Sequence, residues 1–457
     1  MKKFTELTGL APSLLQAVQA LGYTEMTEIQ AGALPLMLNS QDVLAQAKTG
    51  SGKTAAFGLA LLAKLQSEQG RLQSLVLCPT RELADQVSKE IRALARFIPN
   101  VKVLSLCGGI PLRPQLASLA HEPHIVVGTP GRIQELIDKE ALKLDALQSV
   151  ILDEADRMMD MGFLDAVKAI LKKTPNSRST WLFSATYPEE IRAISKQFQK
   201  NPTEVTVESQ HDESVIQQLF YQVEPNDKPE AVIALLMEHQ PESCLIFCNT
   251  KIDAKGLTDV LWKRGISAIE LHGDLEQRDR DETLVQFANG SSRVLVATDV
   301  AARGLDIKAL PMVIAYELPS DADIHVHRVG RTGRAGETGL ALSLVSSREM
   351  GRTSKIEEII GTPITWTRLP SRGNSLSMPA PAMKTLVIDA GRQDKLRPGD
   401  VLGALTGVGG LKANQIGKID VFATRAYVAI QSAFIDSVMQ KLRAGKIKGR
   451  NFRVRKL

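Results

Sequence analysis

Continuous apolar runs alternate with helical stretches over most of this 457-residue chain. The runs are rich in Val, Ile and Leu without intervening polar positions, which is typical of parallel strands that helices cover on both faces. Most of them end in small or polar residues, at the edge where an open α/β sheet places its ligands. The pattern predicts five such strands in each half of the chain, at 74–80, 101–109, 124–130, 149–156 and 179–186, and at 243–250, 267–273, 293–300, 312–319 and 339–345.

The last part of the chain has a different order of elements. Residues 383–391, 416–423, 426–430 and 450–457 are predicted strands, and residues 397–407 and 434–442 are predicted helices. The first helix is expected to end at Gly407. In the last strand, Phe452 and Val454 alternate with Arg453 and Arg455, so the two pairs face opposite ways. The order is β-α-β-β-α-β.

Two breaks in composition divide the chain. A half-polar stretch at 207–215 separates the two halves, and a stretch rich in Pro, Ser and Gly at 368–383 is typical of a flexible linker. We therefore expect an N-terminal domain at 1–207, a linker at 208–215, a second domain at 216–367, a flexible linker at 368–381 and a small basic domain at 382–457. The predicted fold class is α/β, with two doubly wound parallel-sheet domains followed by a small α/β domain.

Charge is concentrated at the end of the chain. Residues 380–457 hold fifteen Lys or Arg and five Asp or Glu, a net charge of +10. The other 379 residues hold 41 basic and 46 acidic residues, a net charge of −5, which together give the +5 of the whole chain. A basic domain joined to a mildly acidic body indicates an anionic partner for that domain. Extra Lys and Arg that only keep a small domain soluble are the plainer alternative.

The rest of the composition excludes several classes of protein. No apolar run reaches the 18 or more residues of a membrane span, and the apolar stretch near the N-terminus is broken by Thr5, Glu6, Gln16 and Gln19. We therefore expect neither membrane insertion nor export but a cytoplasmic protein. The four cysteines stand in strand contexts without Cys-x-x-Cys spacing, which favours buried core residues over zinc ligands.

The first chemical motif is "AKTGSGKT", Ala47 to Thr54. Gly50 and Gly52 allow the backbone to turn its N–H groups toward phosphate oxygens, Lys53 reaches the β- and γ-phosphates, and Thr54 offers its hydroxyl to Mg²⁺. A strict P-loop has Gly where this chain has Ala47. A turn that merely contains glycines is the alternative.

The second motif is "VILDEADRM", in which an apolar strand delivers Asp153 and Glu154 at its carboxyl end. A phosphoryl-transfer site needs a carboxylate for Mg²⁺ and a group that orients the attacking water, and these two residues suit the two roles. Acidic residues at a helix N-terminus are the alternative.

The third motif, "HVHRVGRTGRAG", places Arg328, Arg331 and Arg334 at intervals of three. Such spacing lets a helical turn direct several guanidinium groups to one side, where they can stabilise charge on a transferring phosphate. The second half has no P-loop of its own, so its arginines would have to act on a nucleotide held by the first half. A solvated basic helix is the alternative.

Together these motifs resemble the DEAD-box ATP-dependent RNA helicases. "DEAD" is present literally at Asp153–Asp156, "SAT" stands at Ser184–Thr186, and "PTRELA" begins at Pro79. "GG" at 108–109, "TPGR" at 129–132, "ATDVAARGLD" at 297–306 and "HRVGRTGR" at 327–334 complete an ordered set across residues 4–340. The resemblance implies two tandem RecA-like domains that bind ATP and Mg²⁺ and close on single-stranded RNA, so that closure strips short duplexes locally.

The same resemblance implies roles for particular residues. Catalytic roles fall to Lys53, Asp153 and Glu154 and to the arginine fingers Arg331 and Arg334, while Thr54 and Asp153 hold Mg²⁺, partly through water. "MTEIQ" resembles the adenine-reading Q motif, with Met26 in place of the usual Pro. The nucleotide contacts implied are Phe4, Tyr23, Thr27, Gln30, Ala47, Lys48, Thr49, Gly50, Ser51, Gly52, Lys53, Thr54 and Asp306. Coupling of ATP state to RNA is implied for Asp156, Ser184 and Thr186. RNA contacts are implied for Arg81, Gly109, Thr129, Arg132, Thr250, Arg280 and Thr298.

The C-terminal domain narrows the resemblance further. Its element order resembles the RNA-recognition (RRM-like) fold, although only Tyr427 falls at an expected base-stacking position in the third strand, so basic loops and edges are expected to contribute more. The pieces "RPGDVLGALTG", "IGKI" and "GKIKGR" resemble the bacterial DbpA-type subfamily. That resemblance implies binding to a hairpin in the peptidyl-transferase region of 23S rRNA, action on pre-50S particles and a role in large-subunit assembly. The basic residues that we expect to contact RNA are Lys446, Lys448, Arg450, Arg453 and Arg455.

Several other functions remain open at this stage. The chain could be an RNA-binding scaffold with an inactive ATP site, a DNA-translocating helicase built on the same domains, or a P-loop kinase. It could also be a remodelling clamp or chaperone that acts on other structured RNA. The intact ATP motifs argue against the scaffold, and the Q motif with "SAT" and "HRVGRTGR" favours RNA over DNA.

Overall fold

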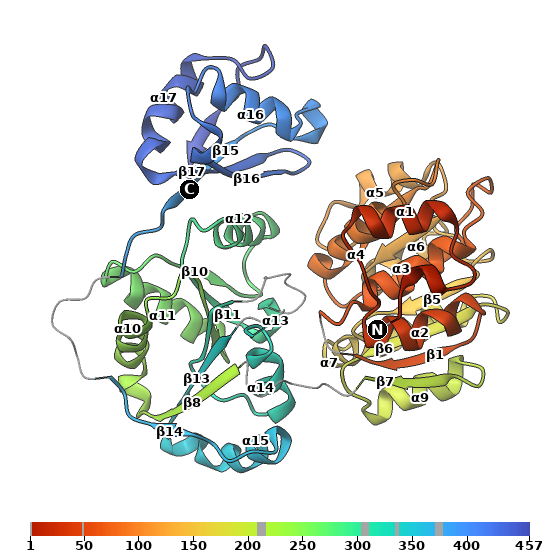
Figure 1. Ribbon diagram of the computed structural model, residues 1–457, viewed down its shortest axis with the longest axis horizontal. Helices are drawn as coiled ribbons and strands as arrows, with labels where there is room; N and C mark the ends of the chain where they lie inside the picture. Colours follow the sequence, from red (N-terminus) through yellow and green to blue (C-terminus); the bar gives the residue numbers. More distant parts are fainter. Residues whose placement is uncertain (1, 48–49, 208–215, 303–309, 334–337, 371–377) are drawn as a thin grey trace. The chain divides into compact units, whose positions relative to one another are not determined.

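The computed structural model describes residues 2–47, 50–207, 216–302, 310–333, 338–370 and 378–457 (Figure 1). Two compact units are present, the first containing the elements from η1 to β7 and the second those from β8 to β18. The predicted linker at 208–215 lies outside the described residues, so the domain limits stay predictions. Among the described residues, no helix is long and apolar enough to cross a membrane.

The first unit is built on a seven-stranded parallel sheet in the order β3-β4-β2-β5-β6-β1-β7. Its strands are β1 (Val43–Gln46), β2 (Ser74–Leu77), β3 (Val103–Leu106), β4 (Ile125–Gly128), β5 (Ser149–Leu152), β6 (Ser179–Ser184) and β7 (Thr203–Thr206). Its helices are η1 (Phe4–Glu6), α1 (Pro12–Ala20), α2 (Glu28–Leu38), α3 (Lys53–Lys64), α4 (Arg81–Leu94), α5 (Leu112–Leu119), α6 (Pro130–Asp138), α7 (Ala155–Asp160), α8 (Leu164–Lys172) and α9 (Glu189–Phe198).

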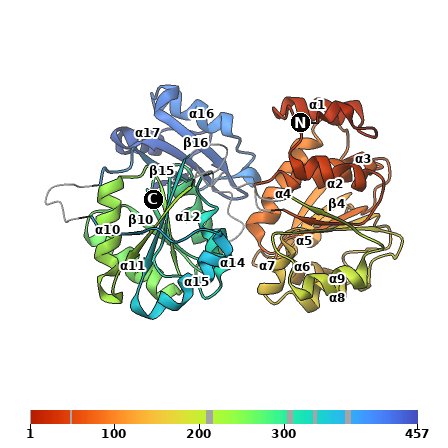
Figure 2. The same ribbon diagram turned by 60° about the horizontal axis from the view of Figure 1, so that its bottom comes forward.

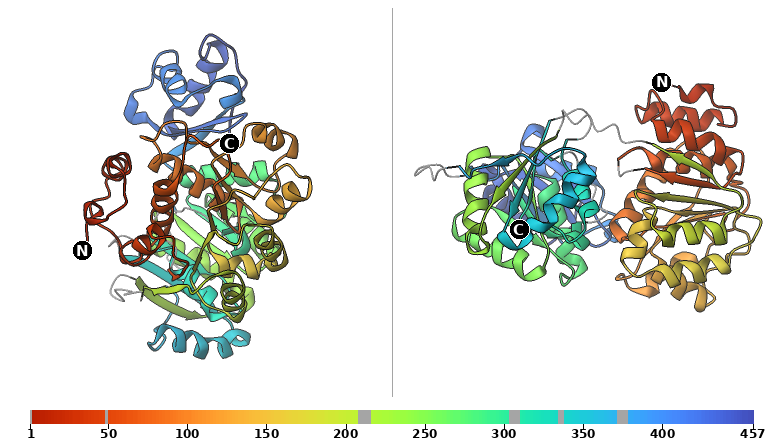
Figure 3. Two further views of the ribbon diagram at one scale, coloured as in Figure 1. Left: turned by 90° about the vertical axis from the view of Figure 1, so that its right-hand side faces the viewer. Right: turned by 90° about the horizontal axis from the view of Figure 1, so that it is seen from below.

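Helices cover both faces of this sheet (Figure 3, right). Successive side chains of a strand point to opposite faces, so each strand contributes to two cores. In β2, Val76 joins the cluster made with helices α1 to α4, while Leu75 and Leu77 join the cluster made with α6, α8 and α9. Burial on both faces explains why the strand sequences are apolar at consecutive positions.

The second unit begins with another parallel sheet, in the order β10-β11-β9-β12-β13-β8-β14. Its strands are β8 (Ile216–Gln222), β9 (Cys244–Cys248), β10 (Ala268–Leu271), β11 (Val294–Thr298), β12 (Met312–Ala315), β13 (Gly339–Val345) and β14 (Trp366–Thr367). Its helices are η2 (Pro225–Asp227), α10 (Lys228–His239), α11 (Lys251–Lys263), α12 (Gln277–Ala288), α13 (Asp299–Ala302), α14 (Ala322–Val329), η3 (Ser347–Arg352) and α15 (Thr353–Ile360).

The second unit ends in a small domain with a four-stranded antiparallel sheet in the order β16-β17-β15-β18. Its elements are β15 (Met383–Ile388), η4 (Arg392–Asp394), α16 (Pro398–Thr406), η5 (Ala413–Gln415), β16 (Ile416–Val421), β17 (Ala426–Gln431), η6 (Ser432–Phe434), α17 (Ile435–Ala444) and β18 (Val454–Lys456). Helices α16 and α17 cover one face of the sheet (Figures 1 and 2). The predicted β-α-β-β-α-β order and the three-part fold class are confirmed, and Gly407 is the C-cap of α16.

All ten strands predicted for the two large sheets are present, and four further strands were not predicted. The missed strands are β1, β7, β8 and β14. Of these, β7 and β14 are edge strands, and β8 has polar residues at Gln217 and Gln218, so none of the three is a continuous apolar run. The four cysteines are buried thiols, as expected.

Candidate functional site

The P-loop follows the carboxyl end of β1 and leads into α3. Gly50 and Gly52 both have φ of 87°, a left-handed conformation that is strained for residues with a Cβ. The backbone N–H of Ala47 donates to the carbonyl oxygen of Ser184 at 3.0 Å, which ties the start of the loop to the neighbouring strand β6. The predicted nucleotide contacts Lys48 and Thr49 lie outside the described residues.

A buried charge cluster occupies the end of this loop. Lys53 Nζ lies 2.9 Å from Asp153 Oδ1 and 3.8 Å from Glu154 Oε1, and Arg157 Nη1 lies 3.3 Å from Glu154 Oε2. Burial by itself lowers the pKa of Lys53, but the adjacent Asp153 and Glu154 outweigh it and raise that pKa. Lys53 is therefore held as a cation beside two carboxyl groups.

The cluster also has the chemistry of a magnesium site. Asp153 is fully buried, and its Oδ2 atom has no hydrogen-bond partner among the described residues. A buried carboxylate oxygen without a partner is costly unless a cation or water satisfies it. No group of three or more His, Cys, Asp or Glu side chains that could hold a metal occurs in the described parts of the chain. The residues present fit Mg²⁺, because this ion commonly binds one or two carboxylates and completes its coordination with waters and phosphate oxygens.

Glu154 stands in a strained conformation at the start of α7. Its φ of 53° and ψ of 53° place it in the left-handed region, and only 3% of its surface is exposed. A left-handed conformation costs a residue with a side chain on the order of 1–2 kcal/mol. The strain occurs at the carboxylate that the sequence assigned to the attacking water.

The Q-motif glutamine contacts the P-loop directly. Gln30 Nε2 donates to the carbonyl oxygen of Gly52 at 3.0 Å, and Gln30 Oε1 accepts from the backbone N–H of Thr27 at 2.9 Å in a capping box that begins α2. A Cβ atom on Gly52 would lie 2.5 Å from Gln30 Nε2. Of the two aromatic residues among the predicted nucleotide contacts, Phe4 is buried in the core and Tyr23 is half-buried.

The last residue of the DEAD motif holds the SAT motif. Asp156 Oδ2 accepts hydrogen bonds from the backbone N–H groups of Ala185 and Thr186, at 3.0 and 3.1 Å, and from the Thr186 hydroxyl at 3.2 Å. The Ser184 hydroxyl accepts from the Asp156 N–H at 3.2 Å and donates to the Thr186 carbonyl oxygen at 2.6 Å. The three residues predicted to couple ATP to RNA therefore form one hydrogen-bonded group.

The predicted RNA contacts of the first unit gather around the segment that follows β3. Gly109 has φ of 70°, and a Cβ there would lie 2.8 Å from Arg81 Nη1. Thr129 accepts from the Gly108 N–H at 3.1 Å, and Arg132 Nη2 donates to the Ile110 carbonyl oxygen at 3.0 Å. Residues from three separate motifs thus meet at one place.

The predicted RNA contacts of the second unit lie at or just past the carboxyl ends of three adjacent strands. Thr250 caps α11 just after β9 and accepts from the Asp253 N–H at 3.1 Å, and Thr298 ends β11. Arg280 lies on α12, and its Nη1 is 3.5 Å from the carbonyl oxygen of His272, just past β10. Because β10, β11 and β9 are neighbours, the three predicted contacts lie along one edge of the sheet.

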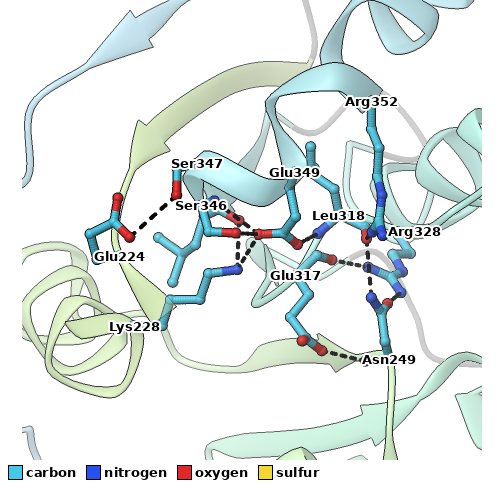
Figure 4. Close-up of polar contacts among 11 residues, drawn as sticks. Glu224, Lys228, Asn249, Glu317, Leu318, Arg328, Ser346, Ser347, Glu349 and Arg352 are labelled. Carbon is cyan, nitrogen blue, oxygen red and sulfur yellow. Dashed lines mark hydrogen bonds and ion pairs between the residues drawn. The ribbon is translucent and has the colours of Figure 1, made fainter. Parts of the chain in front are cut away.

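The arginine motif differs from the prediction of a single helical face. Helix α14 ends at Val329, so Arg331 already lies beyond it. Arg328 is buried and makes a bidentate pair with Asp299, at 2.8 and 2.7 Å. It also donates to Asn249 Oδ1 at 2.7 Å (Figure 4). Its guanidinium group thus joins the carboxyl ends of β9 and β11.

The two predicted fingers remain untested by these contacts. Arg331 is 4% exposed, and its carbonyl oxygen accepts from the Leu310 N–H at 3.1 Å. Arg334 and the predicted nucleotide contact Asp306 lie outside the described residues.

The basic end of the chain forms a tight hairpin between α17 and β18. Ile447 and Arg450 form an antiparallel bridge, and the two residues between them, Lys448 and Gly449, have φ of 52° and 76°. Positive φ at both central positions is the geometry of a two-residue type I′ turn. Among the predicted RNA contacts of this region, Lys446, Lys448, Arg450 and Arg453 are exposed. Arg455 instead binds Glu282 of α12 at 2.5 Å.

Sequence reasoning missed several residues of these sites. Arg157, which pairs with Glu154, lies next to the DEAD motif, and Asn249 and Asp299 directly follow strands β9 and β11. Position at a strand end was the available signal, but their partners are distant in sequence. Glu282 carried no signal at all, since it lies within an ordinary charged helix.

Three family models match the chain in order: DEAD/DEAH box helicase at residues 27–194, helicase conserved C-terminal domain at 227–336, and DbpA RNA binding domain at 385–456. The chain is 51% identical over 457 residues to the ATP-dependent RNA helicase DbpA of Escherichia coli (strain K12), covering 100% of both chains. It is 37% identical to that of Bacillus subtilis (strain 168), covering 98% of each. The solved structure of S. cerevisiae Dbp5 bound to RNA and ADP BeF3 matches with a TM-score of 0.74 at 31% identity, over 81% of this chain and 96% of that one. The chain therefore belongs to the DEAD-box ATP-dependent RNA helicases of the bacterial DbpA type.

Proposed function

We propose that this RNA helicase hydrolyses ATP with Mg²⁺ at the Lys53, Asp153 and Glu154 cluster. We propose further that its C-terminal domain directs it to the peptidyl-transferase hairpin of 23S rRNA on cytoplasmic pre-50S particles, in large-subunit assembly. The observation that carries the first part is the buried lysine held between two carboxyl groups at the end of a P-loop. The second part is supported by the basic hairpin and by the match to a DbpA RNA binding domain.

The charge cluster accounts for the chemistry that we propose. When phosphate arrives, Lys53 exchanges a carboxylate partner for a phosphate oxygen, which leaves Asp153 free to hold the ion. Mg²⁺, when bound, supplies charge neutralisation on the phosphate oxygens. Glu154 then orients the attacking water, and its strained backbone fixes the carboxylate in one position.

The hydrogen bonds of Asp156 support a coupling role for the SAT motif. Asp156 lies two residues after Glu154 and holds the backbone of Ala185 and Thr186. A shift of the DEAD segment on nucleotide binding is thereby transmitted to the segment after β6. We propose that this connection reports the ATP state to the RNA contacts.

The basic hairpin of the small domain selects which RNA the protein binds. The exposed cations Lys446, Arg450 and Arg453 come from a short, tightly turned segment, so they present positive charge in a defined arrangement. Contacts of Lys and Arg with phosphates give affinity that falls with salt, by close to one power of the salt concentration for each contact. The shape of the RNA then decides which RNA hairpin fits this arrangement of cations.

The test compares two triple variants of the full chain. In the first, Lys446, Arg450 and Arg453 are each replaced by Gln. In the matched control, Arg392, Lys395 and Lys412, which are also exposed cations of the small domain, are replaced by Gln. ATPase activation is measured with a 23S rRNA fragment containing the hairpin and with unrelated structured RNA of equal length.

We expect the hairpin variant to lose its preference for the ribosomal fragment, while the control keeps it. The salt dependence of binding should also become shallower, by about one unit for each phosphate that the variant no longer binds. Equal loss of this preference in both variants would show that the net charge of the small domain attracts RNA, and not the arrangement of cations in the protein's basic hairpin. A parent protein that responds equally to both RNAs would favour the alternative, a remodelling enzyme for structured RNA in general.

A further inference from the structure

One face of the small domain's sheet is covered by the second helicase domain. The strand side chains alternate, so that Leu386 and Val428 lie in the core under α16 and α17, while Val387 and Tyr427 point the other way. These two residues form a separate apolar cluster with Val285 of α12. In Figure 1, α12 lies directly beside the strands of the small domain. Tyr427, the expected base-stacking residue, is only 3% exposed.

A single carboxylate stands at the centre of this interface. Glu282 Oε1 lies 2.5 Å from Arg455 Nη2 of β18 and 3.1 Å from Arg425 Nη1, and it accepts from the Tyr427 hydroxyl at 3.4 Å. Arg278 of the same helix lies 3.5 Å away. Glu282 is 8% exposed, so its charge is largely removed from water and is offset by these cations. Charge-assisted contacts to two guanidinium groups fix direction as well as distance.

Neutral hydrogen bonds close one end of the interface. Asn289 Nδ2, just past α12, donates to Thr385 Oγ1 at 2.9 Å, and the Thr385 and Ser291 hydroxyl oxygens lie 2.8 Å apart. Thr385 is 1% exposed. Apolar, charged and neutral polar contacts therefore come from three turns of one helix and the segment that follows it.

We propose that Glu282 is a positioning residue, which seats the RNA-binding domain on α12 in one orientation and thereby sets where captured RNA stands relative to the second helicase domain. Two features of the interface support this role. The contact engages Arg425 and Arg455, leaving the hairpin cations exposed for RNA. Helix α12 also carries the predicted RNA contact Arg280, two residues before Glu282 and hence on a different side of the helix.

As a consequence, the small domain is held at a fixed distance from the second helicase domain and is not merely tethered to it. A domain held only by a Pro-, Ser- and Gly-rich linker samples many positions, which lowers the effective concentration of neighbouring duplex at the helicase domains. A seated domain holds that duplex at one place. The position of the small domain on α12 does not depend on which RNA that domain prefers.

The first measurement reports position in the full chain without RNA. Exposed positions Lys255 on α11 and Ser437 on α17 are changed to Cys and labelled for distance measurement; the native cysteines, all buried, are poor competitors for the label. Three backgrounds are compared: parent, Glu282→Arg, and Glu282→Arg with Arg455→Glu. The matched control is Glu358→Arg, the same charge change at an exposed position of α15.

We expect one narrow distance distribution in the parent and in the control. Glu282→Arg should broaden the distribution, because a new cation then faces Arg278, Arg425 and Arg455. The added Arg455→Glu should narrow it again by restoring an ion pair. Rescue by the second substitution separates positioning from a general loss of folding. A parent distribution that is already broad, or one that Glu282→Arg leaves unchanged, overturns the proposal.

The second measurement uses a short duplex joined to a hairpin that the parent protein binds. Duplexes separated per ATP hydrolysed should fall about tenfold in Glu282→Arg, as effective concentration is lost. ATPase turnover at saturating RNA should stay near the parent value, because the ATP site is untouched. An unchanged unwinding yield alongside a broadened distribution would overturn the positioning role, whereas loss of RNA preference in the hairpin variants bears only on the proposed function.

Discussion

The carboxylate of Asp156 accepts hydrogen bonds from both the backbone N–H and the hydroxyl of Thr186, at 3.1 and 3.2 Å. The same oxygen also holds the N–H of Ala185. A side chain in the DEAD motif is thus bonded three times to the SAT motif, thirty residues later in the chain.

This relationship predicts that ATP hydrolysis and unwinding can be separated. Thr186→Ala removes the hydroxyl contact but leaves the backbone contacts, so ATPase activity should remain while unwinding falls about 5- to 150-fold, the range typical of a coupling free energy between two sites. Strand separation and phosphate release are measured on the same RNA. Thr206→Ala, at an exposed position of β7, is the control. Parallel loss of both activities would contradict a coupling role.

Substitutions in the charge cluster should stop hydrolysis. In the proposed mechanism, Lys53→Ala removes the positive charge that stabilises the phosphates and Glu154→Gln removes the group that orients water. RNA-stimulated turnover should therefore fall by about 10²–10³-fold in each variant. Lys89→Ala, at an exposed position of α4, should have no effect. Turnover at the parent rate in either cluster variant would show that the site lies elsewhere.

Arg331 and Arg328 should respond differently, although they are three residues apart. Arg331→Ala and Arg334→Ala are expected to lower turnover at saturating ATP more than ATP affinity, because a finger acts on the transition state. Arg348→Ala, an exposed arginine of the same domain, is the control. A collapse of ATP affinity with normal turnover would refute the finger role.

Arg328→Ala should instead destabilise the second helicase domain. Arg328 is buried and Asp299 is partly buried, so removing Arg328 leaves the carboxylate without its partner, which costs about 3 kcal/mol, the lower end of the range for a buried pair. Thermal unfolding followed by hydrogen exchange of the peptides around α14 measures the loss. A domain of unaltered stability would show that the Arg328 contacts are dispensable.

Buried His325 predicts an acid sensitivity of the same domain. Burial and the nearby Arg328 lower its pKa from 6.5 to about 4. The centroids of the His325 and Phe220 rings lie 5.6 Å apart. Between these pH values the unfolded chain binds a proton that the folded domain does not, so stability is fully present above about pH 6.5 and decreases as pH falls toward 4. The loss from this group reaches about 3 kcal/mol.

Replacing the histidine should flatten that profile. The midpoint of urea unfolding is measured from pH 7 to pH 4 in the parent, in His325→Phe and in His239→Phe, an exposed histidine of α10. Only His325→Phe should reduce the slope. Identical slopes in all three would contradict the shifted pKa.

The sequence by itself determined the three-part α/β architecture and predicted which residues form most of the candidate sites. Strands buried on both faces must be apolar at consecutive positions, so ten of them could be located directly. Motifs such as "GSGKT" and "DEAD" carry their chemistry in local order, and the small domain's helix ends at the predicted Gly407. Strand β8 was not predicted because its glutamines interrupt the apolar run.

Only the tertiary structure decided which side chains meet across the chain. Arg328 is a clamp on Asp299 rather than part of a helical row of arginines, since α14 ends one residue later. Tyr427 lies at a base-stacking position in the strand pattern, yet its hydroxyl bonds Glu282. Sequence spacing specifies which residues are neighbours on one element, whereas contacts between elements depend on how their faces pack. The sequence around Glu282, a lone glutamate in a charged helix, therefore gives no sign of the two arginines that it binds some 140 to 170 residues further on.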